Sequence, residues 1–431
     1  MNKFVILPHQ LFDIQYLDKE SYTYILYEHP QYFTKYNFNK KKLVLHHASM
    51  QYYYDYLKSK KFKVQYIHYN EKFNIKDYTL FDPIDKLELE NNYTMLESPN
   101  FLLNKEIYEK YRKKTKSFFF NAFYNYGKEQ INVIPDIKSQ DKYNRESIKE
   151  EIEEQTFPSN VSDEKYIKKG ITYVNKHFDS NYGNTDNFIY PISHKNAKKF
   201  LKDFIKNKFE NFGVYQDAIM KDRSYLYHSL LSSSINIGLL NPSEIIELIM
   251  PLKDKIPLNS FEGYIRQLFW REYQRYCYIY FNFRNKQYFN NTKNLTKDWY
   301  TGTLDIEPVD NAIKRAFDTA YLHHIERLMV IGNFMNLSGI KPIEGFKWFM
   351  EFSIDSYEWV MEQNVLDMVF FVSNGKTMRR PYASSSNYIL KMSNYKKGPW
   401  ADKWNKLYDD FIVRNKDKLY KYRYFFKNLK V

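Results

Sequence analysis

The chain of 431 residues is long enough for two or three domains, and it has no apolar run near the ~18 residues that a membrane-spanning helix requires, which excludes an integral membrane protein. The one cysteine, Cys277, excludes an intramolecular disulfide and a cysteine-ligated metal centre, and it fits a reducing compartment. The net charge of +14 suits a polyanionic partner such as nucleic acid, although a lysine-rich composition is equally typical of AT-rich coding.

Short β-favouring runs alternate with helical spacing at the start of the chain. Strands are predicted at 4–7, 24–27, 43–45, 62–67, 78–81 and 94–96, and a helix at 48–57. This alternation predicts a doubly wound parallel sheet in an α/β domain at residues 1–125. Ligands of such sheets bind at the carboxyl ends of the strands, and His9, Gln10 and Glu28 follow the first two runs.

The pattern then changes twice. Residues 101–124 have a helical period, whereas residues 130–169 are polar, charged and interrupted, which is typical of a solvated linker. We expect an interdomain connector at 126–195. Beyond it, helices are predicted at 200–209, 242–250, 261–280, 312–336, 342–352 and 404–414, with Asn241 and Pro242 as a helix start. Residues 196–431 are therefore expected to form a larger, all-helical domain.

Serines cluster before Gly238 in the second half. Ser229, Ser232, Ser233 and Ser234 place hydroxyl and backbone donors where a phosphate could approach closely. By itself, such a cluster is more often a loop or a helix cap.

A second group of polar side chains shares one helix face. Arg266, Gln267, Trp270 and Arg271 lie at i, i+1, i+4 and i+5 of the predicted helix 261–280. A tryptophan between two arginines could stack on a base and hold phosphates. The alternative is a core tryptophan beside surface arginines.

His323 and His324 are adjacent on a predicted helix, where consecutive residues diverge by about 100°. One ring can therefore face a pocket while the other packs elsewhere. An imidazole suits proton transfer near neutral pH, although an arbitrary histidine pair is more often structural.

Several segments together resemble one family, the photolyase and cryptochrome superfamily. The resemblance is carried by residues 212–218, by 227–240 with the serines, by Trp270-Arg271-Glu272, by 323–329, by 332–334 and by 380–384. It runs from residue 1 to about 420 and is sharpest between 187 and 392. The sequence is most similar to the bacterial photolyase-related branch, whose studied members repair (6-4) photoproducts.

The resemblance implies an FAD cofactor in the helical domain. The residues it assigns to cofactor binding are Tyr215, His228, Ser229, Ser232, Ser233, Ser234, Asn236, Gln267, Trp270, Arg271, Arg327, Asn333, Asp355 and Met361. It also implies a second, ribityllumazine-like antenna chromophore near His9, Gln10 and Glu28.

Catalytic and DNA-binding residues follow from the same resemblance. His324 is expected to donate a proton to the lesion with His323 as its partner, while Tyr382 and Tyr388 line the lesion side. Arg266, Arg379, Arg380 and Met368 are expected to contact DNA. Trp348 is expected to pass electrons to the flavin, but Phe349 stands where the family has a tyrosine, so Trp299, Trp359 or Tyr300 could substitute.

Two departures from the family pattern bear on function. The four cysteines of the branch's iron–sulfur cluster are absent, so we expect no such cluster and expect Trp400 and Trp404 to fill its space. Met361 stands where the family has a carboxylate near flavin N5, which would alter the redox chemistry of the flavin.

The leading hypothesis is a blue-light-driven DNA photolyase that acts on (6-4) or cyclobutane dimers in UV-damaged DNA. A cryptochrome-like photoreceptor without repair activity is the alternative, motivated by Met361 and Phe349. A nucleic-acid-binding protein that has lost its cofactor is a third reading. In each case we expect a soluble, monomeric, cytoplasmic protein associated with the nucleoid and with no membrane partner.

Overall fold

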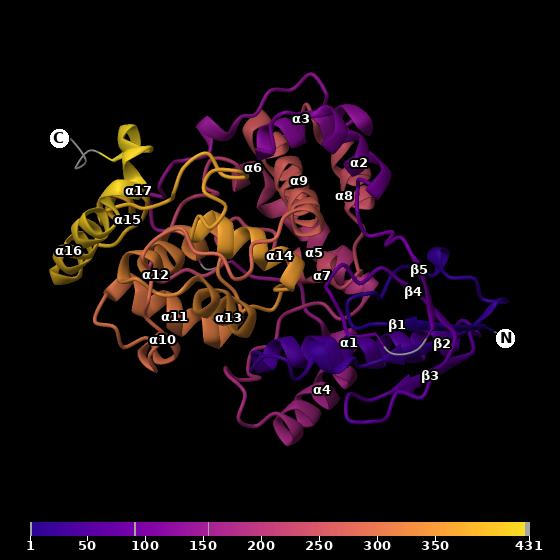
Figure 1. Ribbon diagram of the computed structural model, residues 1–431. Helices are drawn as coiled ribbons and strands as arrows, with labels where there is room; N and C mark the ends of the chain where they lie inside the picture. Colours follow the sequence, from indigo (N-terminus) through magenta and orange to yellow (C-terminus); the bar gives the residue numbers. More distant parts are fainter. Residues whose placement is uncertain (1, 90–91, 154, 427–431) are drawn as a thin grey trace.

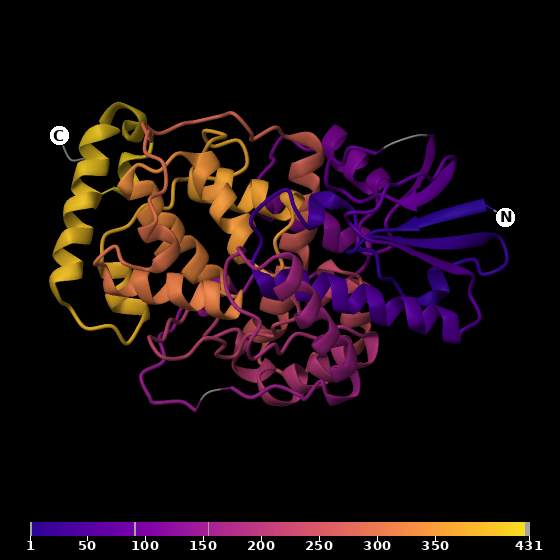
Figure 2. The ribbon, with the colours of Figure 1, turned by 90° about the horizontal axis from the view of Figure 1, so that it is seen from below.

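The two ends of the chain build different architectures. The computed structural model describes residues 2–89, 92–153 and 155–426. A parallel sheet lies at one end of the molecule, and the last helices lie at the other (Figures 1 and 2).

The sheet has five parallel strands in the order β3-β2-β1-β4-β5. They are β1 (Asn2–Ile6), β2 (Tyr22–Tyr27), β3 (Val64–Ile67), β4 (Tyr78–Phe81) and β5 (Tyr93–Leu96). The central strand β1 pairs Ile6 with Leu26 of β2, and both side chains are fully buried. This order confirms the doubly wound parallel sheet that the sequence predicts.

The strand predicted at 43–45 is wrong. These residues lie in helix α1 (Lys40–Ser59), which Asn39 caps by accepting a hydrogen bond from the Lys41 amide. Leu43, Val44 and Leu45 are fully buried because α1 is covered by the sheet on one side and by α4 (Glu164–His177) on another. A short apolar run does not distinguish a buried helix from a strand.

The middle of the chain packs against both ends. Helices α2 (Lys105–Lys114) and α3 (Phe120–Gln130) precede the predicted connector in the chain. Helix α3 packs on α9 of the helical domain. Helix α4, within the predicted connector, returns to α1, where a Cβ on Gly170 would lie 3.1 Å from that of Ala48. The domain boundaries themselves stay a prediction.

The described residues from 196 to 426 contain helices and no strand of a sheet, which confirms the all-helical domain. The final residues, 427–431, lie outside the described part of that domain. The α-helices are α5 (His194–Asn207), α6 (Phe209–Phe212), α7 (Ser232–Asn236), α8 (Pro242–Ile249), α9 (Leu258–Tyr280), α10 (Asp298–Thr301), α11 (Glu307–Thr319), α12 (Asn333–Ser338), α13 (Pro342–Phe352), α14 (Glu358–Met361), α15 (Asn387–Met392), α16 (Pro399–Arg414) and α17 (Lys416–Tyr420).

Shorter helical segments complete the chain. Two are π-helical, η6 (Glu326–Gly332) and η7 (Glu362–Val369). The 3-10 turns are η1 (Ile14–Tyr16), η2 (Pro30–Tyr32), η3 (Asp141–Tyr143), η4 (Val161–Asp163), η5 (Met250–Leu252) and η8 (Arg423–Phe425). Asn241 caps α8, with Pro242 in its first turn, as predicted.

The single helix predicted at 312–336 is wrong. The chain breaks after α11 because Ala320 adopts a left-handed conformation with φ 58°. The hydroxyl of Thr319 accepts the amide hydrogen of Tyr321, and the Ala320 carbonyl accepts that of Ile354. The break places His323 and His324 at the start of a new segment, which continues as η6.

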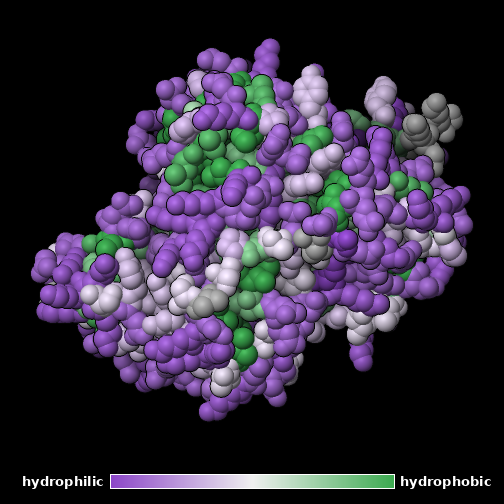
Figure 3. All heavy atoms as spheres, turned by 180° about the vertical axis from the view of Figure 1, so that it is seen from behind, coloured by the Kyte–Doolittle hydropathy of each residue, from purple (hydrophilic) through white to green (hydrophobic). Residues whose placement is uncertain are grey.

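The back face of the molecule carries hydrophilic and apolar side chains in different places (Figure 3). Figure 3 shows a back face that is mostly hydrophilic, with apolar side chains gathered in separate patches. Among the described residues, no helix combines the length and the apolar character that a membrane span needs.

Candidate functional site

Asp355 is the centre of a polar cluster that joins three segments of the helical domain. Its carboxylate accepts the Ser232 hydroxyl of α7 at 2.6 Å, and its backbone carbonyl accepts the Asn236 amide at 2.9 Å. Arg327 of η6 donates to both carboxylate oxygens, at 2.9 and 3.2 Å. Burial opposes ionisation, but the Arg327 guanidinium holds the pKa of Asp355 below its ordinary value. The cluster is therefore a buried ion pair that fixes α7 against η6.

The serines beside this ion pair have unused hydrogen-bonding capacity. Ser233 and Ser234 are buried, and their hydroxyl groups have no partner in the described part of the chain. An unpaired buried hydroxyl costs free energy, so two adjacent ones in one helical turn indicate a polar ligand.

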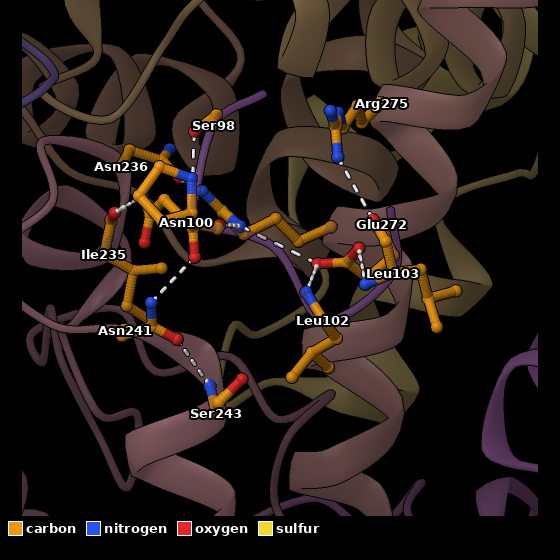
Figure 4. A network of polar contacts seen from close by, with 12 residues as sticks. Ser98, Asn100, Leu102, Leu103, Ile235, Asn236, Asn241, Ser243, Glu272 and Arg275 are labelled. Atoms are coloured by element: carbon orange, nitrogen blue, oxygen red, sulfur yellow. Dashed lines mark hydrogen bonds and ion pairs between the residues drawn. The ribbon is translucent and has the colours of Figure 1, made fainter. Parts of the chain in front are cut away.

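Arg271 links the same helical turn to the sheet domain. Its guanidinium donates to the Asn236 side chain at 2.9 Å and to the Asn100 carbonyl at 2.7 Å. Asn100 in turn donates to the Ile235 carbonyl of α7 at 2.6 Å, as Figure 4 shows. Burial lowers the pKa of Arg271 to about 10. The guanidinium lies over the Trp359 ring, with its carbon 5.1 Å from the ring centroid.

Glu272, next in the chain, holds the connecting loop in place. Its carboxylate accepts the backbone amides of Leu102 and Leu103 at 3.0 and 3.1 Å, and Arg275 donates to the Leu103 carbonyl (Figure 4). The Trp-Arg-Glu sequence of α9 therefore has a structural role, because it locks the loop after β5 onto the helical domain.

One face of α9 is more accessible than the rest of the helix. Gln267, Trp270 and Arg271 are half-buried, whereas their neighbours on the other faces are buried. The Trp270 ring stacks on Phe120 with centroids 3.8 Å apart and planes 7° apart. The prediction that the fourth residue of this face, Arg266, contacts DNA is corrected. Arg266 is buried and forms an ion pair with Asp141 at 3.0 Å, so it offers no surface for DNA.

Three histidines meet beside this region. His228 and His323 stack with ring centroids 4.7 Å apart and planes 13° apart, and both are buried. Burial, with some repulsion from His324, lowers the pKa of His228 to about 3, and burial also lowers that of His323. His324 is exposed, and its Nε2 lies 3.3 Å from the Asp217 carboxylate. The cluster thus pairs two neutral, buried rings with one accessible ring beside an acid.

The tyrosines predicted for the lesion side lie near the same acid. Tyr382 and Tyr388 are half-buried, and burial followed by the charge of Asp217 raises the pKa of Tyr388. Met368 is also half-buried, whereas Arg379 and Arg380 are exposed. The Arg380 guanidinium carbon lies 5.7 Å from the centroid of the Tyr382 ring.

The other predicted cofactor residues have varied surroundings. Tyr215 is half-buried and stacks on Tyr227, and Ser229 is half-buried. Met361 is buried at the end of α14. Asn333 does not offer free groups, because its amide nitrogen and oxygen both bond to Ser384.

Trp348 lies in the core beside the ion pair. Its indole N–H donates to the Trp299 carbonyl at 2.7 Å, and its ring centroid lies 4.7 Å from that of Phe352. The Arg327 guanidinium carbon is 5.4 Å from the Phe352 ring. In the segment after Met392, Trp400 and Trp404 are both buried. That they fill the space of an iron–sulfur cluster stays a prediction.

The predicted antenna residues have internal partners. His9 contacts the Pro83 carbonyl at 3.0 Å, Gln10 donates to the Phe81 carbonyl at 2.7 Å, and Glu28 is fully buried. A cavity of about 460 Å³ does lie by the sheet, but residues other than these three line it, including Leu7, Tyr27, His29, Gln31, Phe73 and Leu89. The assignment of His9, Gln10 and Glu28 to an antenna is therefore corrected.

Sequence reasoning missed three residues that the structure brings forward. Asp217 pairs with His324, Asn100 links α7 to the sheet domain, and Gln363 has a buried side-chain oxygen without a partner in the described chain. Asp217 lies inside segment 212–218, so the resemblance could have drawn attention to it. Asn100 and Gln363 carry no signal in the sequence.

Comparison with known proteins gives relatives for both parts of this architecture. A family model described as deoxyribodipyrimidine photo-lyase-related protein matches residues 4–80 and 71–190. A (6-4) photolyase of Agrobacterium fabrum is 36% identical over 271 residues, which cover 59% of this chain and 54% of that protein. That match spans about half of the relative's length.

Solved structures show the same fold at low sequence identity. An archaeal photolyase from Sulfolobus tokodaii with two FAD molecules aligns over 97% of this chain and 91% of its own, with a TM-score of 0.57 and 12% identity. A cryptochrome from Synechocystis sp. PCC6803 aligns over 97% and 93%, with a TM-score of 0.61 and 14% identity. The chain is therefore similar to photolyase-related proteins in part of its sequence and similar to photolyases and a cryptochrome in its fold.

Proposed function

We propose that this protein binds FAD and repairs (6-4) photoproducts of DNA under blue light. The observation that carries the proposal is the cluster around Asp355, where an ion pair adjoins two buried hydroxyl groups that have no partner among the described residues. The 36% identity to a (6-4) photolyase supports the choice of lesion.

The residues of α7 and η6 fit FAD. Ser233 and Ser234 would donate hydrogen bonds to the diphosphate, which would satisfy their hydroxyl groups. Arg327, Asp355 and Asn236 form a fixed polar wall for the ring system. Bound and reduced, FAD supplies the electron that light transfers to the lesion.

On the lesion side, His324 is placed to act as the general acid. The Asp217 carboxylate would orient its ring, while the stacked and neutral rings of His323 and His228 lie beside it. Tyr382, Tyr388 and Met368 would receive the flipped base.

DNA contacts would come from the exposed arginines at the rim of this region. Arg379 and Arg380 can offer charge-assisted bonds to phosphates, which would offset the cost of a few kcal/mol for flipping a damaged base.

The test uses oligonucleotides with one (6-4) photoproduct or one cyclobutane dimer, incubated with flavin-loaded, reduced protein under blue light. Chromatography of the digested DNA should show restored bases in the (6-4) substrate. His324→Asn should lower the repair rate by about 100-fold or more while flavin content stays unchanged. His177→Asn, at an exposed histidine of α4, is the control. Flavin-loaded protein that leaves both lesions intact would contradict the proposal.

One observation favours a second function, a cryptochrome-like photoreceptor. Met361 is a buried, neutral thioether at the position that the resemblance places near the flavin, and a cryptochrome is among the structural neighbours. Flavin-loaded protein without repair activity, but with a light-dependent change in the affinity for a partner protein, would support this function over repair.

We also propose that the cavity beside the sheet holds an antenna chromophore of the ribityllumazine type. Its aromatic and apolar lining, with Tyr27, Phe73 and Leu7, suits a planar ring. Leu7→Trp should remove a second chromophore from the absorption spectrum of the purified protein while the flavin bands remain. A spectrum without any second chromophore in the unsubstituted protein would contradict this assignment.

A further inference from the structure

Three metal-ligating side chains meet at the carboxyl ends of two strands, outside the flavin site. Glu28 follows β2, His68 follows β3, and His47 lies on α1. One potential ligand atom from each lies within 4.8 Å of the others. The carboxyl ends of parallel strands are where open α/β sheets bind ligands.

Both imidazole rings point the same nitrogen at one carboxylate. His47 Nδ1 lies 2.7 Å from Glu28 Oε1, and His68 Nδ1 lies 3.3 Å from Glu28 Oε2. Hydroxyl groups of Tyr66 and Tyr173 also donate to this carboxylate, at 2.7 and 3.0 Å. The His47 ring is held in place by Tyr173, with ring centroids 3.7 Å apart and planes 8° apart.

The ion-pair partners of this carboxylate are histidines. Glu28 is fully buried, and no lysine or arginine in the described part of the chain forms an ion pair with it. A buried carboxylate needs a cation or a metal ion to offset its lost hydration. The hydroxyl groups of Tyr66 and Tyr173 are neutral donors, so the compensating charge comes from protonated histidines or from a metal ion that takes the place of their protons.

We propose that Glu28, His47 and His68 bind a divalent transition-metal ion of the Zn²⁺ class. Two imidazole nitrogens and one carboxylate oxygen form a ligand set that suits Zn²⁺, with water in the fourth position. On binding, a protonated imidazole releases its Nδ1 proton to solvent and keeps the proton on Nε2, so the ring is neutral and its Nδ1 lone pair coordinates the metal. The phenols of Tyr66 and Tyr173 remain bonded to the carboxylate and orient it.

The site has an entry path and a structural consequence. The His68 side chain is 37% exposed, whereas those of His47 and Glu28 are buried, so an ion can reach the ligands from the His68 side. Two of the ligands directly follow β2 and β3 and the third lies on α1, and Tyr173 adds α4, which lies alongside α1 (Figure 1). A metal here ties the predicted connector to the sheet domain. It acts as a structural ion, independent of the flavin.

The test is calorimetric titration of tag-free, chelator-treated protein with ZnCl₂ at neutral pH, together with thermal unfolding. We expect one ion per chain and a higher unfolding temperature with Zn²⁺. His68→Asn should weaken binding by at least about 10-fold and abolish the temperature shift. His177→Asn is the matched control, because this exposed histidine packs on Tyr173 without facing Glu28.

The results of this titration decide whether Glu28, His47 and His68 bind a metal ion or only form hydrogen bonds with one another. No Zn²⁺ binding by the unsubstituted protein, or equal binding by His68→Asn, would overturn the proposal. The three side chains would then be a hydrogen-bonded group without a metal ion. Glu28→Gln should also lose the ion. If that variant does not fold, His68→Asn still decides, because its exposed side chain makes a weaker contribution to folding.

Discussion

At the scale of single residues, Ser233 and Ser234 of α7 allow an effect on folding to be measured separately from an effect on FAD binding. Ser234→Ala removes a buried hydroxyl that has no partner in the described part of the chain, so the free energy of unfolding without FAD should stay the same or rise by up to about 1 kcal/mol. Affinity for FAD should fall by about 10-fold or more, because a hydrogen bond to a charged phosphate is lost. Urea unfolding and fluorescence titration with FAD measure the two effects.

Ser260 provides the matched control for this substitution. It is also buried, but its hydroxyl donates to the Glu210 carbonyl and accepts the Gly213 amide. Ser260→Ala should therefore lower stability by about 1 kcal/mol and leave FAD affinity unchanged. Equal FAD affinity in Ser234→Ala and the unsubstituted protein would show that α7 does not hold the diphosphate.

The ion pair between Arg327 and Asp355 should make stability depend on pH in the acid range. The folded-state pKa of Asp355 lies below its ordinary value of 3.8, so its contribution is complete above that value and is lost as pH falls through the folded pKa. Asp355→Asn should cost about 3 kcal/mol at neutral pH, since it leaves the half-buried guanidinium of Arg327 without its carboxylate partner.

Urea unfolding of both proteins as a function of pH tests this prediction. The difference between them should shrink as the pH falls below about 4 and should not change between pH 6 and 8, as estimated from the ordinary carboxylate range. A difference that persists unchanged in acid would mean that the Asp355 charge contributes nothing to stability.

At the scale of single elements, Glu272 of α9 controls how the sheet domain is attached. Glu272→Gln weakens the bonds that the carboxylate accepts from the Leu102 and Leu103 amides. We expect a loss of about 2 kcal/mol in the free energy of unfolding and faster proteolysis of the loop after β5. Glu109→Gln, which alters one exposed bond to Tyr280, should change neither. Proteolysis at equal rates in both variants would refute the locking role of Glu272.

Local patterns predicted most elements well, because their apolar faces have one clear period. The strand 78–81 and the helix 342–352 agree with β4 and α13 at both ends. The run 43–45 failed because α1 is buried on several sides, which erases its amphipathic pattern. The break at Ala320 could not be predicted, since the Ile354 amide that bonds to its carbonyl is distant in sequence.

The candidate site was predictable where the resemblance gave single residues, and less so where contacts are long-range. Arg327, Asp355 and the serines were assigned to one site, and they meet in one cluster. Arg266 was assigned to the surface from its spacing, but Asp141 of another segment pairs with it and buries it. The pairing of Asp217 with His324 likewise depends on tertiary structure.

At the scale of the whole molecule, the net charge of +14 does not say where DNA would bind, but the positions of the exposed arginines suggest a surface that can be tested. Arg380→Gln should weaken binding to UV-damaged DNA and reduce the slope of log Kd against log salt by about 1, as expected for one lost phosphate contact. Lys60→Gln, at the end of α1 in the sheet domain, removes the same charge and should leave the slope unchanged. Equal slopes in all three proteins would place the DNA surface elsewhere.

The central claim is that the polar cluster around Asp355 holds FAD. The most direct measurement is the visible absorption spectrum of the purified protein after incubation with FAD and removal of free cofactor by gel filtration. We predict one flavin per folded chain and a loss of flavin bands in the Ser233→Ala, Ser234→Ala double variant, whose circular dichroism should be unchanged. A folded, colourless, unsubstituted protein would contradict the claim.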